Sequence, residues 1–189
     1  FWTRRIQYAV DYRRTVMGQD FDNCRLIFGE SDGFPGLTVD RFGPILVAQV
    51  LSLGMELRKM QLFVLLLQAL RAGGEQIDAI YERNDVKLRQ KEGMEQGTGF
   101  VPLDGLQTDL DGHVMIRENG ILYDVDYIHG QKTGFFLDQK YNRLAVAKLA
   151  KGKTVLDCFT HTGAFALNAA KGGAASVTAA DISQEADDM

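Results

Sequence analysis

The sequence holds few cysteines and no apolar run long enough to cross a membrane. Cys24 and Cys158 are the only cysteines among 189 residues, and they lie far apart, which excludes a disulfide framework and a cysteine-rich zinc site. The longest apolar run, residues 60–70, has about half of the roughly 20 residues that a bilayer crossing needs. With no secretory signal at the start, these absences predict a cytoplasmic protein without a membrane contact.

Positive charge is in the minority. The chain has 21 Lys and Arg against 25 Asp and Glu, a formal net charge of −4 and a pI of about 5.4. This balance excludes a strongly basic nucleic-acid binder as a description of the whole chain, although local patches decide phosphate binding. Basic residues gather in three stretches, which either contact phosphates or lie on solvated helix faces. The stretches are Arg4, Arg5, Arg13 and Arg14; Arg83, Lys87, Arg89 and Lys91; and Lys132, Lys140, Arg143, Lys148, Lys151 and Lys153.

The first two thirds of the chain have the pattern of an α+β domain. Residues 1–19 show apolar positions at helical spacing and predict a helix, which we assign to a linker over residues 1–21. Between residues 22 and 128, short alternating β runs separated by Gly- and Pro-containing turns surround one helix at about residues 55–72. Asn119-Gly120 is typical of a type I′ hairpin turn. Residues 22–128 are therefore predicted to form a compact α+β domain.

From His129 the pattern changes to alternating helices and strands. A helix at about residues 137–150 precedes a strand at 154–159, a second helix and a strand at 175–182. This βαβ order predicts a parallel sheet in a domain over residues 129–189. So short a parallel sheet would leave an open edge, so we expect either that the native protein continues or that it forms a homodimer. Phe1 lies in what resembles mid-chain helix, and we interpret the sequence as a piece cut at both ends.

The turn after the first of these parallel strands lacks the glycines of nucleotide-binding loops. The positions of a G-x-G-x-x-G motif are held by Phe159, His161 and Ala164, which excludes the dinucleotide fingerprint and argues against a nicotinamide oxidoreductase. No Gly-Lys-Ser/Thr follows the strand, which excludes a P-loop.

What remains in this segment is Asp157 at the strand end, Gly163 at the helix start and Asp181 after the next strand. The spacing from Gly163 to Asp181 is close to the roughly 20 residues at which an acid reaches ribose hydroxyls. A ligand with a ribose but no pyrophosphate fits, and S-adenosylmethionine (SAM) meets that description. Asp157 would hold its ammonium group and Asp181 its ribose hydroxyls. An alternative, in which both carboxylates only cap helices, stays open.

Longer motifs carry a family resemblance. Residues 130–143, GQKTGFFLDQKYNR, and residues 155–183, VLDCFTHTGAFALNAAKGGAASVTAADIS, resemble the bacterial 23S ribosomal RNA cytosine-5 methyltransferases of the large-subunit methyltransferase I group, which are class I SAM enzymes. Residues 25–43 and 80–93 resemble the central domain of that family. Ala180 is a departure, because a branched apolar residue usually precedes the acid.

The resemblance implies an RNA-binding PUA domain before Phe1, an α+β central domain, and the beginning of an α/β Rossmann-like class I methyltransferase domain that continues after Met189. It implies SAM as cofactor and 23S ribosomal RNA as partner. It also implies the cofactor-binding residues. Lys132, Thr133, Phe135 and Phe136 would form the loop over the cofactor; Asp157, Cys158, Phe159, Thr160, Thr162, Gly163 and Phe165 would form the first turn; Asp181 and Ile182 would hold ribose and adenine.

Methyl transfer to cytosine C5 needs a cysteine thiolate that adds to C6. In the family this cysteine and an Asp-Pro-Pro segment lie on later strands, which implies that no catalytic residue is present before Met189 and that these residues alone are inactive. Cys158 is expected to pack beside the cofactor, and His161 is expected to be a neutral turn residue at a helix N-terminus. Two alternatives stay open: methylation of a guanine, and a non-catalytic module that binds RNA or SAM.

Overall fold

The computed structural model describes residues 1–182, and the chain divides into two compact units. Among the described residues, the first unit comprises residues 1–116 and 125–135, and the second comprises residues 117–124 and 136–182. The chain therefore passes from one unit to the other three times. The predicted domain ranges 1–21, 22–128 and 129–189 stay a prediction.

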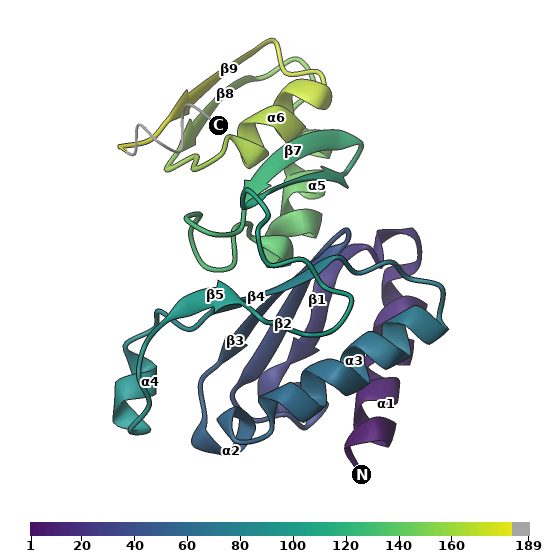
Figure 1. The fold of residues 1–189 in the computed structure, drawn as a ribbon. Helices are drawn as coiled ribbons and strands as arrows, with labels where there is room; N and C mark the ends of the chain where they lie inside the picture. The colour runs from purple at the N-terminus through teal and green to yellow at the C-terminus, as the bar shows by residue number, and fades with distance from the viewer. Residues whose placement is uncertain (183–189) are drawn as a thin grey trace. The chain divides into compact units, whose positions relative to one another are not determined.

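The first unit contains a five-stranded sheet whose strands follow the order of the chain (Figure 1). The strands are β1 (Asn23–Phe28), β2 (Leu37–Phe42), β3 (Ile45–Val50), β4 (Ala79–Arg83) and β5 (Thr98–Phe100). Neighbouring strands are antiparallel except β3 and β4, which are parallel. The alternating sequence predicts the hairpins, whereas the parallel pair was not predicted. It arises because a helix connects β3 to β4 as a crossover.

Two long helices cover this sheet. Helix α1 (Trp2–Met17) and helix α3 (Lys59–Ala72) pack side by side, and α1 also packs on β1 (Figure 1). The short elements are η1 (Gly18–Asp20), η2 (Gly29–Asp32), α2 (Leu53–Glu56) and α4 (Leu88–Lys91). The predicted helix at 55–72 is thus two helices, because Arg58 leaves helical geometry at φ −120°. The core joins apolar residues of both long helices and the sheet, including Ile6, Val10, Leu26, Val39, Leu46, Phe63, Leu66, Leu70 and Ile80.

The second unit contains a parallel strand pair with helices. Its elements are η3 (Leu137–Gln139), α5 (Lys140–Leu149), β8 (Thr154–Cys158), α6 (Ala164–Lys171) and β9 (Ser176–Ala180). Strands β8 and β9 pair in parallel, and α5 packs against α6. The predicted βαβ order and parallel pairing are therefore confirmed.

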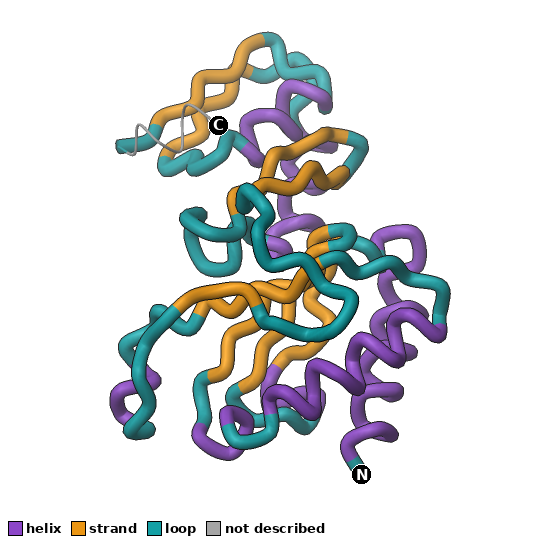
Figure 2. The backbone as a smooth tube through the Cα atoms, in the orientation of Figure 1, coloured by secondary structure: helices purple, strands orange, loops and turns teal. Residues whose placement is uncertain are grey.

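A hairpin, β6 (His113–Glu118) and β7 (Ile121–Asp126), contributes its tip to the second unit. Asn119 and Gly120 in its turn have φ values of 52° and 75°. A type I′ turn needs positive φ at both central residues, so the predicted turn type is confirmed. The segment from β7 to η3 is irregular, as its teal colour in Figure 2 shows. Over residues 1–182, no helix has the length and apolar character needed to span a bilayer.

Candidate cofactor site

The turn between β8 and α6 has an unusual backbone. Phe159, His161 and Gly163 have φ values of 61°, 53° and 71°, and positive φ disfavours residues other than glycine. Hydrogen bonds hold the strained turn: the N–H groups of Phe159 and Thr160 both donate to the Ala180 carbonyl, at 2.8 and 3.2 Å. Since Ala180 ends β9, the turn is fixed to the end of the neighbouring strand.

Asp157 caps the helix that follows it. Its Oδ2 accepts a hydrogen bond from the Thr160 hydroxyl at 2.5 Å and one from the Ala166 N–H, in the first turn of α6, at 3.0 Å. The capping alternative is thus correct for this oxygen. Within residues 1–182, Oδ1 of Asp157 accepts no hydrogen bond from the protein, so this half-buried carboxylate keeps one oxygen for a cationic or hydroxyl group.

Asp181 links the turn to the strand beside it. Its Oδ2 accepts from the His161 N–H at 2.9 Å, and its Oδ1 accepts from the Ile182 N–H at 2.8 Å. In the β8–β9 register Asp157 lies opposite Ala179 and Cys158 opposite Ala180. Asp157 and Asp181 therefore leave adjacent parallel strands at the same edge of the sheet, where ligands of α/β folds bind.

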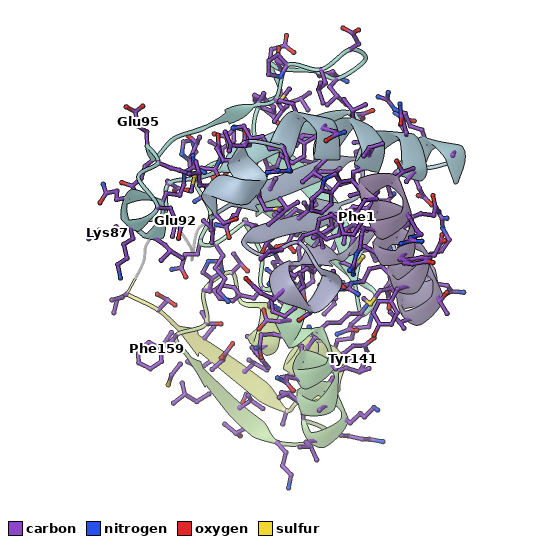
Figure 3. All side chains as sticks on the ribbon, turned by 90° about the horizontal axis from the view of Figure 1, so that it is seen from below. Phe1, Lys87, Glu92, Glu95, Tyr141 and Phe159 are labelled. Atoms are coloured by element: carbon purple, nitrogen blue, oxygen red, sulfur yellow. The ribbon has the colours of Figure 1, made fainter. Side chains whose placement is uncertain are left out.

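The space around this turn is open. A Cβ atom built on Gly163, the residue that caps α6, would meet no heavy atom within 4 Å. Phe159 is 84% exposed, and Figure 3 shows its side chain pointing away from the strands. Cys158 and Ile182 are also exposed. A helix N-terminus carries partial positive charge and free N–H groups, so this edge suits an acceptor-rich ligand.

The remaining residues of the predicted turn are less accessible. Thr160 is buried, whereas Thr162 and Phe165 are half-buried. The guanidinium of Arg143 lies over the Phe165 ring, 5.8 Å from its centroid. Phe165 and Thr160 therefore support the turn from inside the second unit.

His161 is a poor proton acceptor here. Burial lowers the pKa of its imidazole below the ordinary value of 6.5, and the charge of Arg143 lowers it further, although Asp181 acts in the opposite direction. Its ring packs edge-on against Phe136, with centroids 5.3 Å apart. The lowered pKa agrees with the prediction that His161 is neutral. The main cause of the shift is burial, whereas the sequence analysis attributed the neutral form to the helix N-terminus.

Three residues of the predicted cofactor loop belong to the first unit. The Thr133 hydroxyl donates to Oδ2 of Asp40 at 2.7 Å, and Arg25 donates to both oxygens of the same buried carboxylate. Phe135 is 3% exposed. Lys132 is exposed, with φ at 54°. Thr133 and Phe135 thus have structural contacts of their own, and the cofactor role of the loop stays a prediction.

Several predicted RNA-contacting cations are instead used inside the protein, which corrects that part of the prediction. Arg83 donates to the carbonyls of Tyr127 and Gly130, and Arg89 to the Val50 carbonyl and Glu56. Lys140 and Arg143 are also buried. In the second and third basic stretches, the cations that remain exposed are Lys87, Lys91, Lys132, Lys148, Lys151 and Lys153.

The sequence gave no indication of a buried polar network behind the turn. Asn168 of α6 donates to the Tyr123 hydroxyl at 2.9 Å and to the Ala164 carbonyl at 2.8 Å, and it accepts from Asn119 at 3.1 Å. Arg143 pairs with Glu118. These partners are distant in sequence and have no motif, so only the fold reveals that the hairpin tip supports α6.

The chain is similar in sequence and in structure to known proteins. The chain is 44% identical over its whole length to the ribosomal RNA large subunit methyltransferase I of Escherichia coli O139:H28, of which it covers 46%. It thus spans about half the length of this relative. A Streptococcus mutans protein described as a SAM-dependent methyltransferase matches 99% of the chain over 46% of its own, with 26% identity and a TM-score of 0.76. A second methyltransferase structure, determined with SAH, matches 99% of the chain over 45% of its own, with the same identity and TM-score.

A family model described as S-adenosylmethionine-dependent methyltransferase matches residues 68–187, more than half of the chain. The match includes the β8–α6–β9 segment and both carboxylates at its edge. The chain belongs to the S-adenosylmethionine-dependent methyltransferase family.

Proposed function

We propose that this chain is part of an enzyme that methylates C5 of a cytosine in 23S ribosomal RNA, with SAM as methyl donor. The observation that carries the proposal is the 44% identity over the whole chain to a ribosomal RNA large subunit methyltransferase. The motifs at residues 130–143 and 155–183 support the finer assignment to cytosine C5. In the same proposal, residues 22–128 form the α+β central domain and residues 129–189 begin the class I methyltransferase domain.

The residues at the edge of β8 and β9 suit SAM. Oδ1 of Asp157 is available to accept a hydrogen bond from an ammonium group. Asp181 would accept hydrogen bonds from ribose hydroxyls. The open space beside Gly163 allows a ligand to approach the backbone at the start of α6. When bound, SAM supplies the methyl group as an electrophile.

The other proposed contacts surround these two carboxylates. Phe159 and Ile182 are 84% and 96% exposed, and apolar side chains of this kind offer packing surface to an adenine. Cys158, Thr160, Thr162 and Phe165 complete the turn, and Lys132, Thr133, Phe135 and Phe136 are the proposed loop. Cys158 is not proposed as the nucleophile, because it ends β8, next to the residues that we propose to contact the cofactor.

The test is methyl transfer to ribosomal RNA followed by identification of the product. The full-length enzyme that contains this chain is incubated with radiolabelled SAM and unmodified 23S ribosomal RNA, and the RNA is digested to nucleosides for mass spectrometry. We expect 5-methylcytidine. Methylguanosine instead would support the alternative base, and SAM binding without transfer to any ribosomal RNA would support a non-catalytic module. Self-association, the predicted homodimer, is tested on the same sample by sedimentation.

A further inference from the structure

The outer face of α1 combines positive charge with exposed aromatic rings. Helix α1 contains four arginines and one aspartate, in a chain whose net charge is −4. Its inner face is buried through Ile6, Ala9 and Val10. Its outer face borders a groove of about 600 Å³ in the first unit. The residues that line this groove are Arg5, Tyr8, Ala9, Tyr12, Arg13, Val16, Met17, Phe28, Ser31 and Asp32.

Aromatic rings in this groove are exposed and supported by cations. Tyr8, Tyr12 and Phe28 are 62%, 57% and 51% exposed. The Arg13 guanidinium lies 4.9 Å from the Tyr12 ring centroid, and the Arg25 guanidinium lies 5.1 Å from that of Phe28. Tyr8 and Tyr12 are four residues apart, so they lie on one face of the helix, about 6 Å apart along its axis. Solvent-exposed rings in a row are the surfaces on which unpaired bases stack.

The charge of the groove is positive. Its one acid, Asp32, already accepts hydrogen bonds from Arg13 at 2.7 Å and from the Phe28 N–H at 2.6 Å. Arg5 is exposed, and among the residues that the structure describes no acidic side chain forms an ion pair with it. Its guanidinium contacts the Phe1 ring. The neighbouring Arg4 is exposed as well. An unpaired arginine at the border of an aromatic groove provides a phosphate contact without the cost of breaking an internal pair.

We propose that this groove, which we call the α1 groove, binds single-stranded RNA. The proposal rests on the proposed function in naming ribosomal RNA as its natural ligand. Bases stack on Tyr8 and Tyr12, while Arg5 contacts the phosphate backbone. Two of the three basic stretches considered from the sequence have cations that are in part buried, whereas the α1 stretch presents exposed charge and exposed rings together. Since stacking and phosphate contacts read no base edges, the groove contributes affinity and position, with little sequence preference.

The test uses a fluorescein-labelled 12-nucleotide single-stranded RNA of mixed sequence and fluorescence anisotropy. We expect Tyr8→Ala/Tyr12→Ala to weaken binding at least tenfold, and Arg5→Glu to weaken it severalfold and to lower the salt dependence by about one phosphate contact. Tyr141→Ala and Arg71→Glu are the matched controls: Tyr141 is 61% exposed on α5, and Arg71 is exposed on α3. Both should bind as the unchanged protein does. All five substituted side chains are exposed, so thermal unfolding should be unaffected.

Two results would overturn the proposal: unchanged affinity in the tyrosine variant, or an equal loss in the controls. SAM affinity, measured by calorimetry, should be the same in every variant. If the unchanged protein binds the RNA through Tyr8 and Tyr12 but transfers no methyl group to ribosomal RNA, the proposed function fails and the α1 groove stands. If it transfers the methyl group equally well and binds RNA equally well in the tyrosine variant, the groove fails and the function stands.

Discussion

Arg143 of α5 and Glu118 of β6 form an ion pair in the interior of the second unit, with Nη1 and Oε1 2.6 Å apart. Their side chains are 2% and 3% exposed. Nη2 of the same arginine donates to the Phe136 carbonyl at 2.7 Å. This guanidinium therefore connects the hairpin tip with the segment before α5, and it also lies over Phe165. Its charge serves the fold and not an RNA phosphate.

Removal of one partner of this ion pair should lower the unfolding free energy. Arg143→Met leaves the Glu118 carboxylate buried without its cation, and such a change costs about 3–5 kcal/mol of unfolding free energy. Arg143→Met/Glu118→Leu removes both charges and should recover about half of that loss or more. Urea denaturation measures the unfolding free energy of both variants. Equal losses in the single and the double variant would show that the unpaired Glu118 carboxylate adds no penalty, and would contradict this prediction.

The carboxylate after β9 should control cofactor affinity. Asp181→Ala should weaken SAM binding by about 1–3 kcal/mol, because two ribose hydroxyls would lose their acceptor. Titration calorimetry measures the change, with Asp109→Ala, in an exposed loop, as the control. Asp181→Asn removes the negative charge but keeps an oxygen that accepts from the His161 N–H. It therefore separates the effect of the charge on SAM affinity from the effect of a disturbed turn. Unchanged affinity in both Asp181 variants would remove this residue from the proposed site.

Protonation of His161 should destabilise the protein. Its pKa in the folded state is lowered, mainly by burial. Above the ordinary value of 6.5 the ring is neutral in both states and adds no pH dependence. As the pH falls below that value the unfolded state binds the proton first, so stability falls until the folded-state pKa is passed. Unfolding free energies between about pH 5 and pH 8 should depend less on pH in His161→Gln than in the unchanged protein. Identical slopes would contradict the lowered pKa.

The hairpin turn offers a test of backbone conformation. Gly120 has φ at 75°, where a side chain costs about 1–2 kcal/mol. Gly120→Ala should lower the unfolding free energy by at least that amount, because the added methyl also displaces the Lys171 amine, which donates to the Asn119 carbonyl at 2.6 Å. The matched control is Gly54→Ala, inside α2 with open space around it, which should be neutral or slightly stabilising. A loss as large in Gly54→Ala would argue against a conformational cause.

The sequence predicted what local pattern encodes. Period-2 alternation and the Asn119-Gly120 pair led to the hairpins, and the strand–helix–strand order led to the parallel pair β8–β9. The parallel pairing of β3 with β4 was missed, because a strand that follows a helix can return in either direction. The carboxylates of Asp157 and Asp181 were identified by their spacing, and the structure places them at the same sheet edge.

Contacts between distant segments were not predictable in this way. The Asp40 carboxylate accepts from Thr133, 93 residues later, and no motif connects them. The sequence around a charged residue also does not distinguish a solvated side chain from one that is buried beside an opposite charge. Arg143 and Lys140 were therefore grouped with exposed lysines of the same segment, although both are buried. Only the fold separates these two environments.

The three passages of the chain between its two units constrain how this protein can be divided or recombined. A junction at residue 129 would take residues 117–124 away from α5 and α6, and with them the partners of Arg143 and Asn168. A single protease cut where the chain passes from one unit to the other would release neither unit intact, because both units consist of two separate segments of the chain. A chimera of two relatives that is joined at a single point in this region should combine a hairpin tip from one protein with α5 and α6 from the other, and the buried contacts between them should not match. The hairpin and the two helices should therefore be exchanged together.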